Sequence, residues 1–330
     1  MSFISYAQNF EDVVLNRALQ DVEAGFYIDV GANDPVEDSV TKAFYDKGFV
    51  GINIEPEYEF FQKLKDARPN DTNLNLAVSS TQKSIQFYVS KIRGWSTTDK
   101  NITQDTNRDY LLLETRTVEA KSLDEICSQN GVKEIHFLKI DVEGAEKDVL
   151  QSFSFTIKPW IVVVEATLPN SNIDASSSWE YILTSNNYTF VYFDGINKFY
   201  LSDEKQELKP YFAYPPNVLD DFIIYPFYES MQQNDILEKE VNQLKDQAEE
   251  LTNKLADATD ELFKSKEQML FMQADLNMVL HSRSWKITKP LRNITQALKA
   301  LLGKKSHLAK QTDDSALSQE AKDIYKNLTK

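Results

Sequence analysis

A short apolar run that ends at a carboxylate and a glycine turn constrains the fold of this chain more than any other feature. Residues 26–30 predict a strand, the Gly31-Ala32-Asn33 turn follows, and a polar segment then opens a helix. At such a junction in an open α/β sheet, free N–H groups and a glycine that allows close backbone approach can receive a ligand. The residues alone therefore predict a nucleotide-like ligand beside Asp29, Gly31 and Asn33.

The next predicted strand, residues 50–54, ends at Glu55. Glu55 follows Gly31 by about 24 residues, an offset at which a carboxylate accepts hydrogen bonds from a ribose diol. Pro56 and Glu57 come next, so Glu55 also fits the acidic start of a helix. The two roles are compatible, and both stay open.

Residues 135–146 form a third junction of the same kind. An apolar strand runs to Asp141, and a glycine-containing turn delivers a helix, so several carboxylates gather near one strand end. Asp141 lies beside Asp29 if the two strands are neighbours, and buried like charges then raise pKa values, which suits a proton acceptor or a cation site. The apolar strand that follows ends in another carboxylate, Glu165. Glu146 is expected to be a solvent-exposed acid in the first turn of its helix.

The remaining segments of residues 1–230 alternate between strand and helix patterns, which predicts a doubly wound α/β sheet closed by an antiparallel pair. In the first helix, Glu11 and Asp12 are expected on the solvent side. The polar segment 94–116, which contains Trp95, is expected to be irregular and is either a substrate lid or a surface insertion. Helices are predicted at 5–20, 39–47, 56–67, 122–129 and 179–186, and strands at 73–78, 84–89, 160–165, 190–193 and 198–201.

Charge and composition exclude several classes of protein. The net charge is -15 although residues 281–310 hold eight Lys or Arg and no acid, so the rest of the chain is strongly acidic and unsuited to nucleic acid. One cysteine, Cys127, and three histidines exclude an intrachain disulfide and a Cys/His zinc site. The first residues lack the basic and apolar regions of a signal peptide, and no apolar run is long enough to span a membrane, so a cytoplasmic protein is expected.

Several of these segments, in this order, resemble the FkbM family of S-adenosylmethionine-dependent methyltransferases. The segments that carry the resemblance are 6–12, 29–33, 54–56, 139–146 and 160–166. The resemblance spans about residues 5–200 and implies a Rossmann-like class I methyltransferase fold, which is a seven-stranded, mostly parallel sheet with an antiparallel hairpin at one edge. The chain departs from the family pattern at Asp34-Pro35, where many members continue with Ile-Gly, and this leaves the shape of the loop open.

The resemblance also implies S-adenosylmethionine as the cofactor. Asp29 and Gly31, with Asn33 in the same loop, would then approach its methionine portion, and Glu55 its ribose hydroxyls. Asp141 falls on the family's acidic position beside the transferred methyl group. The backbone of Ala77 and Val78 would contact the adenine.

Methyl transfer to a hydroxyl is an in-line displacement, which needs an aligned acceptor oxygen and a group that takes its proton. Asp141 is the first choice for this base, followed by Glu143 and Glu165. His136 comes after them because a histidine inside a strand is more often a core residue. A divalent ion at Asp141, Glu143 or Glu165 has no recognisable ligand spacing, so no metal is assigned.

A seven-residue apolar repeat predicts a coiled coil over residues 231–280 and hence a homo-oligomer. The alternative is a long helix folded back on its own domain. The repeat, called the heptad seam below, consists of Asn234, Val241, Ala248, Leu255, Leu262, Met269 and Leu276 at one position and Leu237, Leu244, Leu251, Ala258, Ser265, Met272 and Val279 at the other.

Residues 281–305 predict a basic amphipathic helix, which either lies peripherally on the anionic inner face of a membrane or packs on a protein partner. The stretch 282–292 is similar to tails of bacterial surface-glycan enzymes, which favours a sugar acceptor. Residues 306–330 are expected to be poorly ordered.

The first functional hypothesis is therefore an O-methyltransferase that acts on a sugar hydroxyl of a bacterial surface glycan or polysaccharide. The alternative is an inactive methyltransferase-fold scaffold that oligomerises and tethers a glycan-assembly complex through its coiled coil. A dinucleotide oxidoreductase is disfavoured because the full Gly-x-Gly-x-x-Gly pattern is absent.

Overall fold

The computed structural model describes residues 2–91, 96–98, 112–168, 171 and 173–301. Trp95 and most of the predicted lid, together with the tail from 302 onward, lie outside the described residues. Contacts divide the chain into two units, Met1–Ile236 and Leu237–Lys330.

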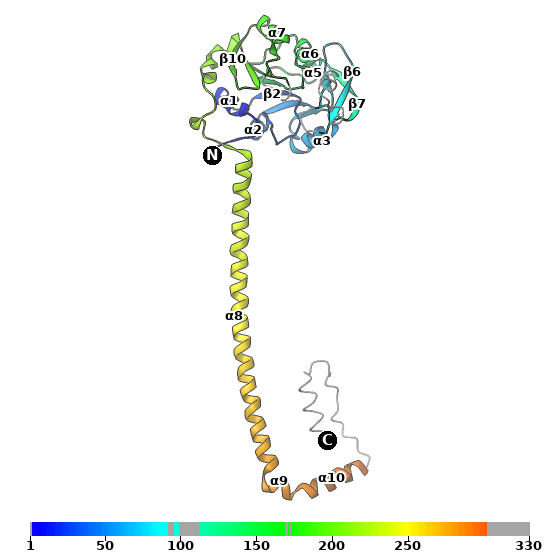
Figure 1. The fold of residues 1–330 in the computed structure, drawn as a ribbon, viewed down its shortest axis with the longest axis vertical. Helices are drawn as coiled ribbons and strands as arrows, with labels where there is room; N and C mark the ends of the chain where they lie inside the picture. The colour runs from blue at the N-terminus through cyan, green and yellow to red at the C-terminus, as the bar shows by residue number, and fades with distance from the viewer. Residues whose placement is uncertain (1, 92–95, 99–111, 169–170, 172, 302–330) are drawn as a thin grey trace. The chain divides into compact units, whose positions relative to one another are not determined.

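A seven-stranded sheet forms the centre of the first unit (Figure 1). Five neighbouring strands are parallel, whereas β11 runs antiparallel to both β9 and β10. This confirms the predicted mostly parallel sheet with an antiparallel hairpin at one edge. In spatial order the strands are β10 (Tyr188–Phe193), β11 (Asn197–Ser202), β9 (Ile161–Glu165), β8 (Phe137–Ile140), β2 (Phe26–Val30), β3 (Val50–Ile54) and β4 (Thr72–Leu74).

Helices cover both faces of the sheet because the central strands are apolar on both sides. On β8, for example, Leu138 and Ile140 pack in the cluster that α5, α6 and α7 cover, whereas Phe137 packs in the cluster under α1, α2 and η3. The helical elements of the unit are α1 (Glu11–Ala18), α2 (Lys42–Asp46), α3 (Tyr58–Ala67), α5 (Leu123–Gln129), α6 (Glu146–Gln151), η2 (Ser176–Ser178), α7 (Glu180–Ser185), η3 (Asp203–Phe212) and η4 (Val218–Asp220).

Two smaller sheets complete the unit, and they correct two predictions. β1 (Phe3–Ser5) pairs with β12 (Phe222–Ile224), and β5 (Ala77–Val78) and β6 (Ser84–Ser90) both pair with β7 (Leu112–Lys121). The single strand predicted at 73–78 is therefore wrong, because β4 and β5 belong to different sheets. The prediction that 94–116 is irregular is also wrong at its end, because residues 112–116 belong to β7.

The predicted helix at 5–20 begins only at Glu11, because a buried carboxylate organises the residues before it. Asp12 is fully buried and accepts hydrogen bonds from Ser5 Oγ at 2.7 Å and from the N–H of Tyr6 at 2.7 Å. Glu11 is buried as well. The prediction that both acids face solvent is therefore wrong.

Arg68, at the end of α3, is completely buried and holds the loop that follows β2. Its guanidinium donates to Thr41 Oγ1 at 2.7 Å, to Ser39 Oγ at 2.6 Å and to the carbonyl of Pro35 at 2.5 Å. This one side chain therefore fixes the segment between the first strand of the site and α2.

The second unit is helical in its described part. α8 (Tyr225–His281) is a continuous helix of 57 residues with no buried residue, and the heptad seam lies within it. The helix ends because the Ser282 side chain caps α9 (Arg283–Ile287), which precedes α10 (Lys289–Leu301). The single basic helix predicted at 281–305 is thus interrupted, and its binding to a membrane or a partner stays a prediction. Within the described part of the chain, no helix is both long and apolar enough to cross a bilayer.

Replacing Arg68 with Met should lower the free energy of unfolding by at least about 3 kcal/mol, because the polar groups of the loop lose a buried charged donor. Urea unfolding followed by circular dichroism measures this change. Lys65→Met, at an exposed position of the same helix, should stay within about 0.5 kcal/mol of the unsubstituted protein. Equal midpoints for the two variants would show that Arg68 does not hold the loop.

Candidate functional site

A pocket of about 220 Å³ opens where β2, β3, β8 and β9 end. Carboxyl ends of parallel strands meet at one edge of a sheet, which is where ligands of α/β proteins bind. All the residues assigned to the site from the sequence line this pocket except His136, the last-ranked candidate base, and their individual roles stay predictions. These residues are Asp29, Gly31, Asn33, Glu55, Ala77, Val78, Asp141, Glu143 and Glu165.

A row of polar side chains crosses the sheet one residue before the strands end. Asp29 lies opposite Asn53 on β3 and opposite Lys139 on β8, and Asn53 lies opposite Asn73 on β4. Residues in register point to the same face of a sheet, so this row lies under the pocket on the α1 and α2 side. The register of β2 and β8 therefore places the Lys139 cation next to the Asp29 carboxylate.

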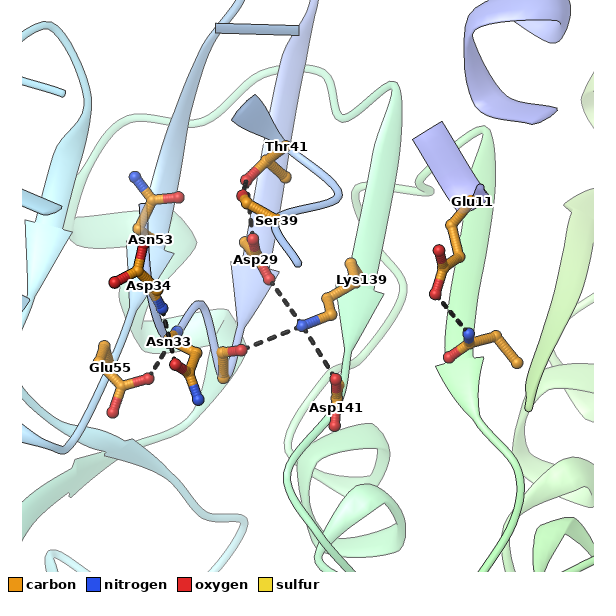
Figure 2. Close-up of polar contacts among 12 residues, drawn as sticks. Glu11, Asp29, Asn33, Asp34, Ser39, Thr41, Asn53, Glu55, Lys139 and Asp141 are labelled. Atoms are coloured by element: carbon orange, nitrogen blue, oxygen red, sulfur yellow. Dashed lines mark hydrogen bonds and ion pairs between the residues drawn. The ribbon is translucent and has the colours of Figure 1, made fainter. Parts of the chain in front are cut away.

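Lys139 connects the two strand ends at the centre of the site, as Figure 2 shows. Its Nζ lies 3.0 Å from the carbonyl oxygen of Gly31, 3.2 Å from Asp141 Oδ2 and 3.4 Å from Asp29 Oδ1. Burial alone would lower the pKa of Lys139, but the charges of Asp141 and Asp29 raise it above its ordinary value. Lys139 is therefore a permanent cation, and no motif in the sequence had assigned it to the site.

The two carboxylate oxygens of Asp29 have different surroundings. Its Oδ2 accepts a hydrogen bond from Thr41 Oγ1 at 2.8 Å, and Thr41 Oγ1 in turn accepts one from Arg68. Its Oδ1 is buried and accepts no hydrogen bond from the described residues, although Lys139 lies within ion-pair distance. A donor group of a bound ligand can satisfy this atom.

The loop after β2 does not offer the free N–H groups that the sequence predicted. The N–H groups of Gly31 and Ala32 both donate to the carbonyl of Ile54, at 3.0 and 3.2 Å, and the N–H of Asn33 donates to Glu55 Oε2 at 2.8 Å. The loop thus joins β2 to the end of β3 through its own backbone donors. The N–H groups expected to be free for a ligand are therefore engaged within the protein.

Gly31 is required at its position for a close approach within the protein. Its φ is +80°, and a Cβ added there would lie 1.8 Å from the carbonyl oxygen of Asp141. The approach predicted toward a ligand is therefore toward the Asp141 backbone. The Asp34-Pro35 departure also has a defined shape, because Asp34 Oδ1 accepts from the N–H groups of Val36 at 3.0 Å and Glu37 at 3.1 Å.

Glu55 is buried at the end of β3 and faces the pocket. Its Oε2 accepts from Asn33, and its Oε1 accepts from the N–H of Glu57 at 2.7 Å. Burial raises the pKa of Glu55 to about 7, although both hydrogen bonds lower it. Glu57 is the N-cap residue of α3, so Glu55 orders the entry to that helix while it lines the site.

Asp141, Glu143 and Glu165 form an acidic cluster whose carboxylate oxygens lie within 4.8 Å of one another. Burial, followed by the charges of Asp141, Glu143 and Glu146, raises the pKa of Glu165 to about 10. Glu165 is therefore protonated at neutral pH beside an Asp141 that pairs with Lys139. Oxygen atoms so arranged could also ligate a divalent cation, so the absence of a metal stays a prediction.

The structure contradicts the prediction for Glu146 and confirms the one for His136. Glu146 is buried rather than solvent-exposed, and its Oε1 accepts from the N–H of Gly144 at 2.9 Å, which fixes the turn that carries Glu143. His136 precedes β8 at the opposite edge of the sheet, and its Nδ1 accepts from the N–H of Phe26 at 3.0 Å. Its ring also packs against Trp160 in a tilted arrangement, so the structural role expected for this histidine is confirmed.

Glu11 is a pocket residue that the sequence reasoning misplaced. Its carboxylate accepts from Asn197 Nδ2 at 2.7 Å and from the N–H of Asn9 at 2.9 Å. Asn197 opens β11 directly opposite Glu165, so the edge hairpin brings Glu11 to the acidic side of the pocket. Burial, followed by the charge of Asp194, raises the pKa of Glu11 to about 8. The one sequence signal that could have identified this residue is the acidic pair Glu11-Asp12 at the start of an apolar helix.

The other end of the pocket is apolar. Ala77 and Val78 share this wall with Leu76, Phe87 and Val149, which suits a flat heteroaromatic base. From the segment predicted as a lid or an insertion, residues 96 and 98 also line the pocket. The Thr97 hydroxyl donates to the carbonyl of Glu143 at 2.7 Å, which ties this segment to the acidic cluster.

Comparison with protein-family models identifies a domain in this chain. A family model described as the methyltransferase FkbM domain matches residues 29–199, just over half of the chain. No curated protein matches the chain.

Glu165→Gln should make the melting temperature less sensitive to pH. Between about pH 5 and pH 10 the folded protein binds one more proton at Glu165 than the unfolded chain does, so this group loses stabilising effect as the pH rises. The glutamine side chain of the variant is neutral at every pH, so it binds no proton in either state. The variant should therefore melt close to the unsubstituted protein at pH 5 and a few degrees above it at pH 9.

Differential scanning fluorimetry across this pH range measures the effect. Glu207→Gln, at an exposed position away from the pocket, serves as the matched control and should follow the unsubstituted protein at each pH. Parallel curves for Glu165→Gln and Glu207→Gln would contradict the raised pKa of Glu165.

Proposed function

Because the chain belongs to the FkbM methyltransferase family, we propose that it transfers a methyl group from S-adenosylmethionine to a hydroxyl group of a sugar in a bacterial surface glycan. The observation that carries this proposal is the convergence of Asp29, Glu55 and Asp141 on one pocket with an apolar far wall. The proposed cofactor contacts and the proposed proton transfer rest on the groups that line the two ends of the pocket.

The lining fits the proposed cofactor group by group. S-adenosylmethionine, when bound, supplies an electrophilic methyl group on a positively charged sulfur. The Asp29 carboxylate, whose Oδ1 has no hydrogen-bond donor among the described residues, suits a ligand ammonium group, Glu55 suits ribose hydroxyls, and the wall around Ala77 and Val78 suits adenine. Because the N–H groups of residues 31–33 are engaged within the protein, the loop is poorly suited to the pyrophosphate of a dinucleotide.

Asp141 and Glu165 are suited to different tasks because their surroundings differ: Asp141 pairs with Lys139, whereas burial and neighbouring acids raise the pKa of Glu165. Glu165 holds its proton up to about pH 10, so it donates a hydrogen bond and does not take a proton at neutral pH. Asp141 is kept beside the Lys139 cation and serves as the base. It takes the proton of the acceptor hydroxyl as that oxygen bonds to the methyl carbon, while the electron pair of the broken carbon–sulfur bond stays on sulfur.

The charge of the pocket favours a neutral acceptor rich in hydroxyl groups. Among the described lining residues, Lys139 is the single cation, and Asp29, Asp141 and the Gly31 carbonyl already engage it. Phosphate or carboxylate groups on an acceptor would face a lining in which carboxyl groups far outnumber that one cation. Hydroxyl groups donate hydrogen bonds to the same carboxylates, which supports a sugar rather than a phosphorylated acceptor.

Glu55→Gln should weaken S-adenosylmethionine binding about tenfold or more, because one acceptor oxygen for the ribose hydroxyls becomes an NH2 donor. Isothermal titration calorimetry measures the dissociation constant. Glu59→Gln lies on an exposed turn of α3 outside the pocket and should leave it unchanged. Equal affinities for both variants, or no binding by the unsubstituted protein, would contradict the assignment.

Asp141→Asn should lower the rate of methyl transfer at least about 100-fold while cofactor affinity changes little, because the amide cannot take the hydroxyl proton. Glu165→Gln should retain much of the rate, since Gln resembles the protonated Glu165. Transfer of a labelled methyl group to neutral and to phosphorylated oligosaccharides measures both effects, and the neutral acceptors should react faster. The reverse order of the two variants would assign the base to Glu165.

A further inference from the structure

The heptad seam on α8 is an apolar surface without cover in the described chain. Leu251, Leu255 and Leu262 are 66%, 69% and 70% exposed, and α8 has no buried residue. An amphipathic helix of this length is stable in water when its seam packs against another helix. We propose that α8 pairs in parallel and in register with α8 of a second copy of this chain, as a two-stranded coiled coil.

The charges that flank the seam select a second copy in parallel orientation. With Asn234 at heptad position a, Glu240 and Glu261 occupy position g, and Lys245 and Lys266 occupy position e of the following heptads. In a parallel pair, position g of one helix faces position e of the next heptad on its partner. Glu240 therefore meets Lys245, and Glu261 meets Lys266, across the interface, and two-fold symmetry forms each pair twice.

These pairs belong between helices rather than within one helix. Glu240 and Lys245 are five residues apart, whereas neighbours on a single helix are three or four residues apart. Each remaining g-to-e pair along the seam contains at most one charged side chain, so a parallel arrangement places no like charges opposite each other. The sequence is thus self-complementary in this orientation.

An antiparallel pair of full overlap is less favourable. Pairing residue 234 with residue 279 brings Lys245 close to Lys266 and Glu240 close to Asp275, which are like-charge contacts. A single attractive contact, between Lys254 and Glu261, opposes them. Charge therefore disfavours this orientation.

The polar residues of the seam lead to the same orientation and set the register. In a parallel, in-register pair, the Asn234 side chains of the two copies meet and can hydrogen-bond each other, and the Ser265 hydroxyls do the same. In the antiparallel pair, Asn234 would face Val279 and Ser265 would face Ala248, which offer no side-chain partner. The parallel pair also brings both copies of the basic segment 283–301 to the same end of the coiled coil.

Charge reversal distinguishes the two orientations. In the full-length protein, Glu240→Lys and Lys245→Glu should each weaken self-association several-fold, because each replaces attractive cross-helix pairs with repulsive ones. The double variant should restore the dissociation constant to within about twofold. Sedimentation equilibrium measures these constants, and Glu249→Lys, at an outward-facing b position, is the matched control.

Two results of this experiment would overturn the proposal. A monomer at all concentrations would exclude pairing through α8. Tighter association of each single variant would indicate antiparallel helices, because each reversal would then relieve a like-charge contact.

Disulfide trapping tests the register independently. Ser265→Cys should form an intermolecular disulfide on mild oxidation, whereas Lys264→Cys, one residue away on the outer face, should not. The native Cys127 is buried and present in both variants, so it does not distinguish them. When Ser265→Cys and Ala248→Cys proteins are mixed, each should cross-link only to its own kind. A disulfide between the two variants would refute the parallel register.

Discussion

The structure depends on the neutralisation of charge that is buried where parallel strands end. Lys139 pairs with Asp29 and Asp141, Thr41 links Asp29 to Arg68, and Arg68 holds the loop after β2. A buried charge without a partner is costly, so removal of one member leaves another uncompensated. The contacts that hold neighbouring strand ends and their loops together are therefore the same contacts that shape the pocket.

The sequence was sufficient to predict the carboxylates at the strand ends of the pocket but not the cation between them. Asp29, Glu55, Asp141 and Glu165 each end an apolar run, and parallel strands present their carboxyl ends at one edge, so convergence follows from the pattern. Lys139 lies inside such an apolar run, and the sequence pattern does not say which residue it contacts. Its place in the site follows only from the strand register, which puts Lys139 opposite Asp29.

Other errors of prediction have the same origin, since local patterns do not record long-range contacts. Glu11 has the sequence pattern of a solvent-facing helical residue, yet its carboxylate is buried and accepts a hydrogen bond from Asn197 on a distant hairpin. The run 73–78 has the composition of one strand, yet Asn75 Nδ2 donates to the carbonyl oxygens of Glu55 and Pro56 and the chain changes sheets there. Both features depend on partners that are remote in the chain.

The charge of the site determines which nucleotide-like ligand the fold suits. A strand-to-helix loop with free N–H groups attracts anions, whereas here residues 31–33 direct those donors to Ile54 and Glu55, and carboxylates remain at the surface of the pocket. A positively charged ligand beside Glu165 favours its ionised form and so lowers its pKa from about 10. For the proposed sulfonium cofactor, binding and proton release from the acidic cluster would therefore be linked, and the protein with the cofactor bound would present more carboxylate to the proposed acceptor hydroxyl than the protein without it.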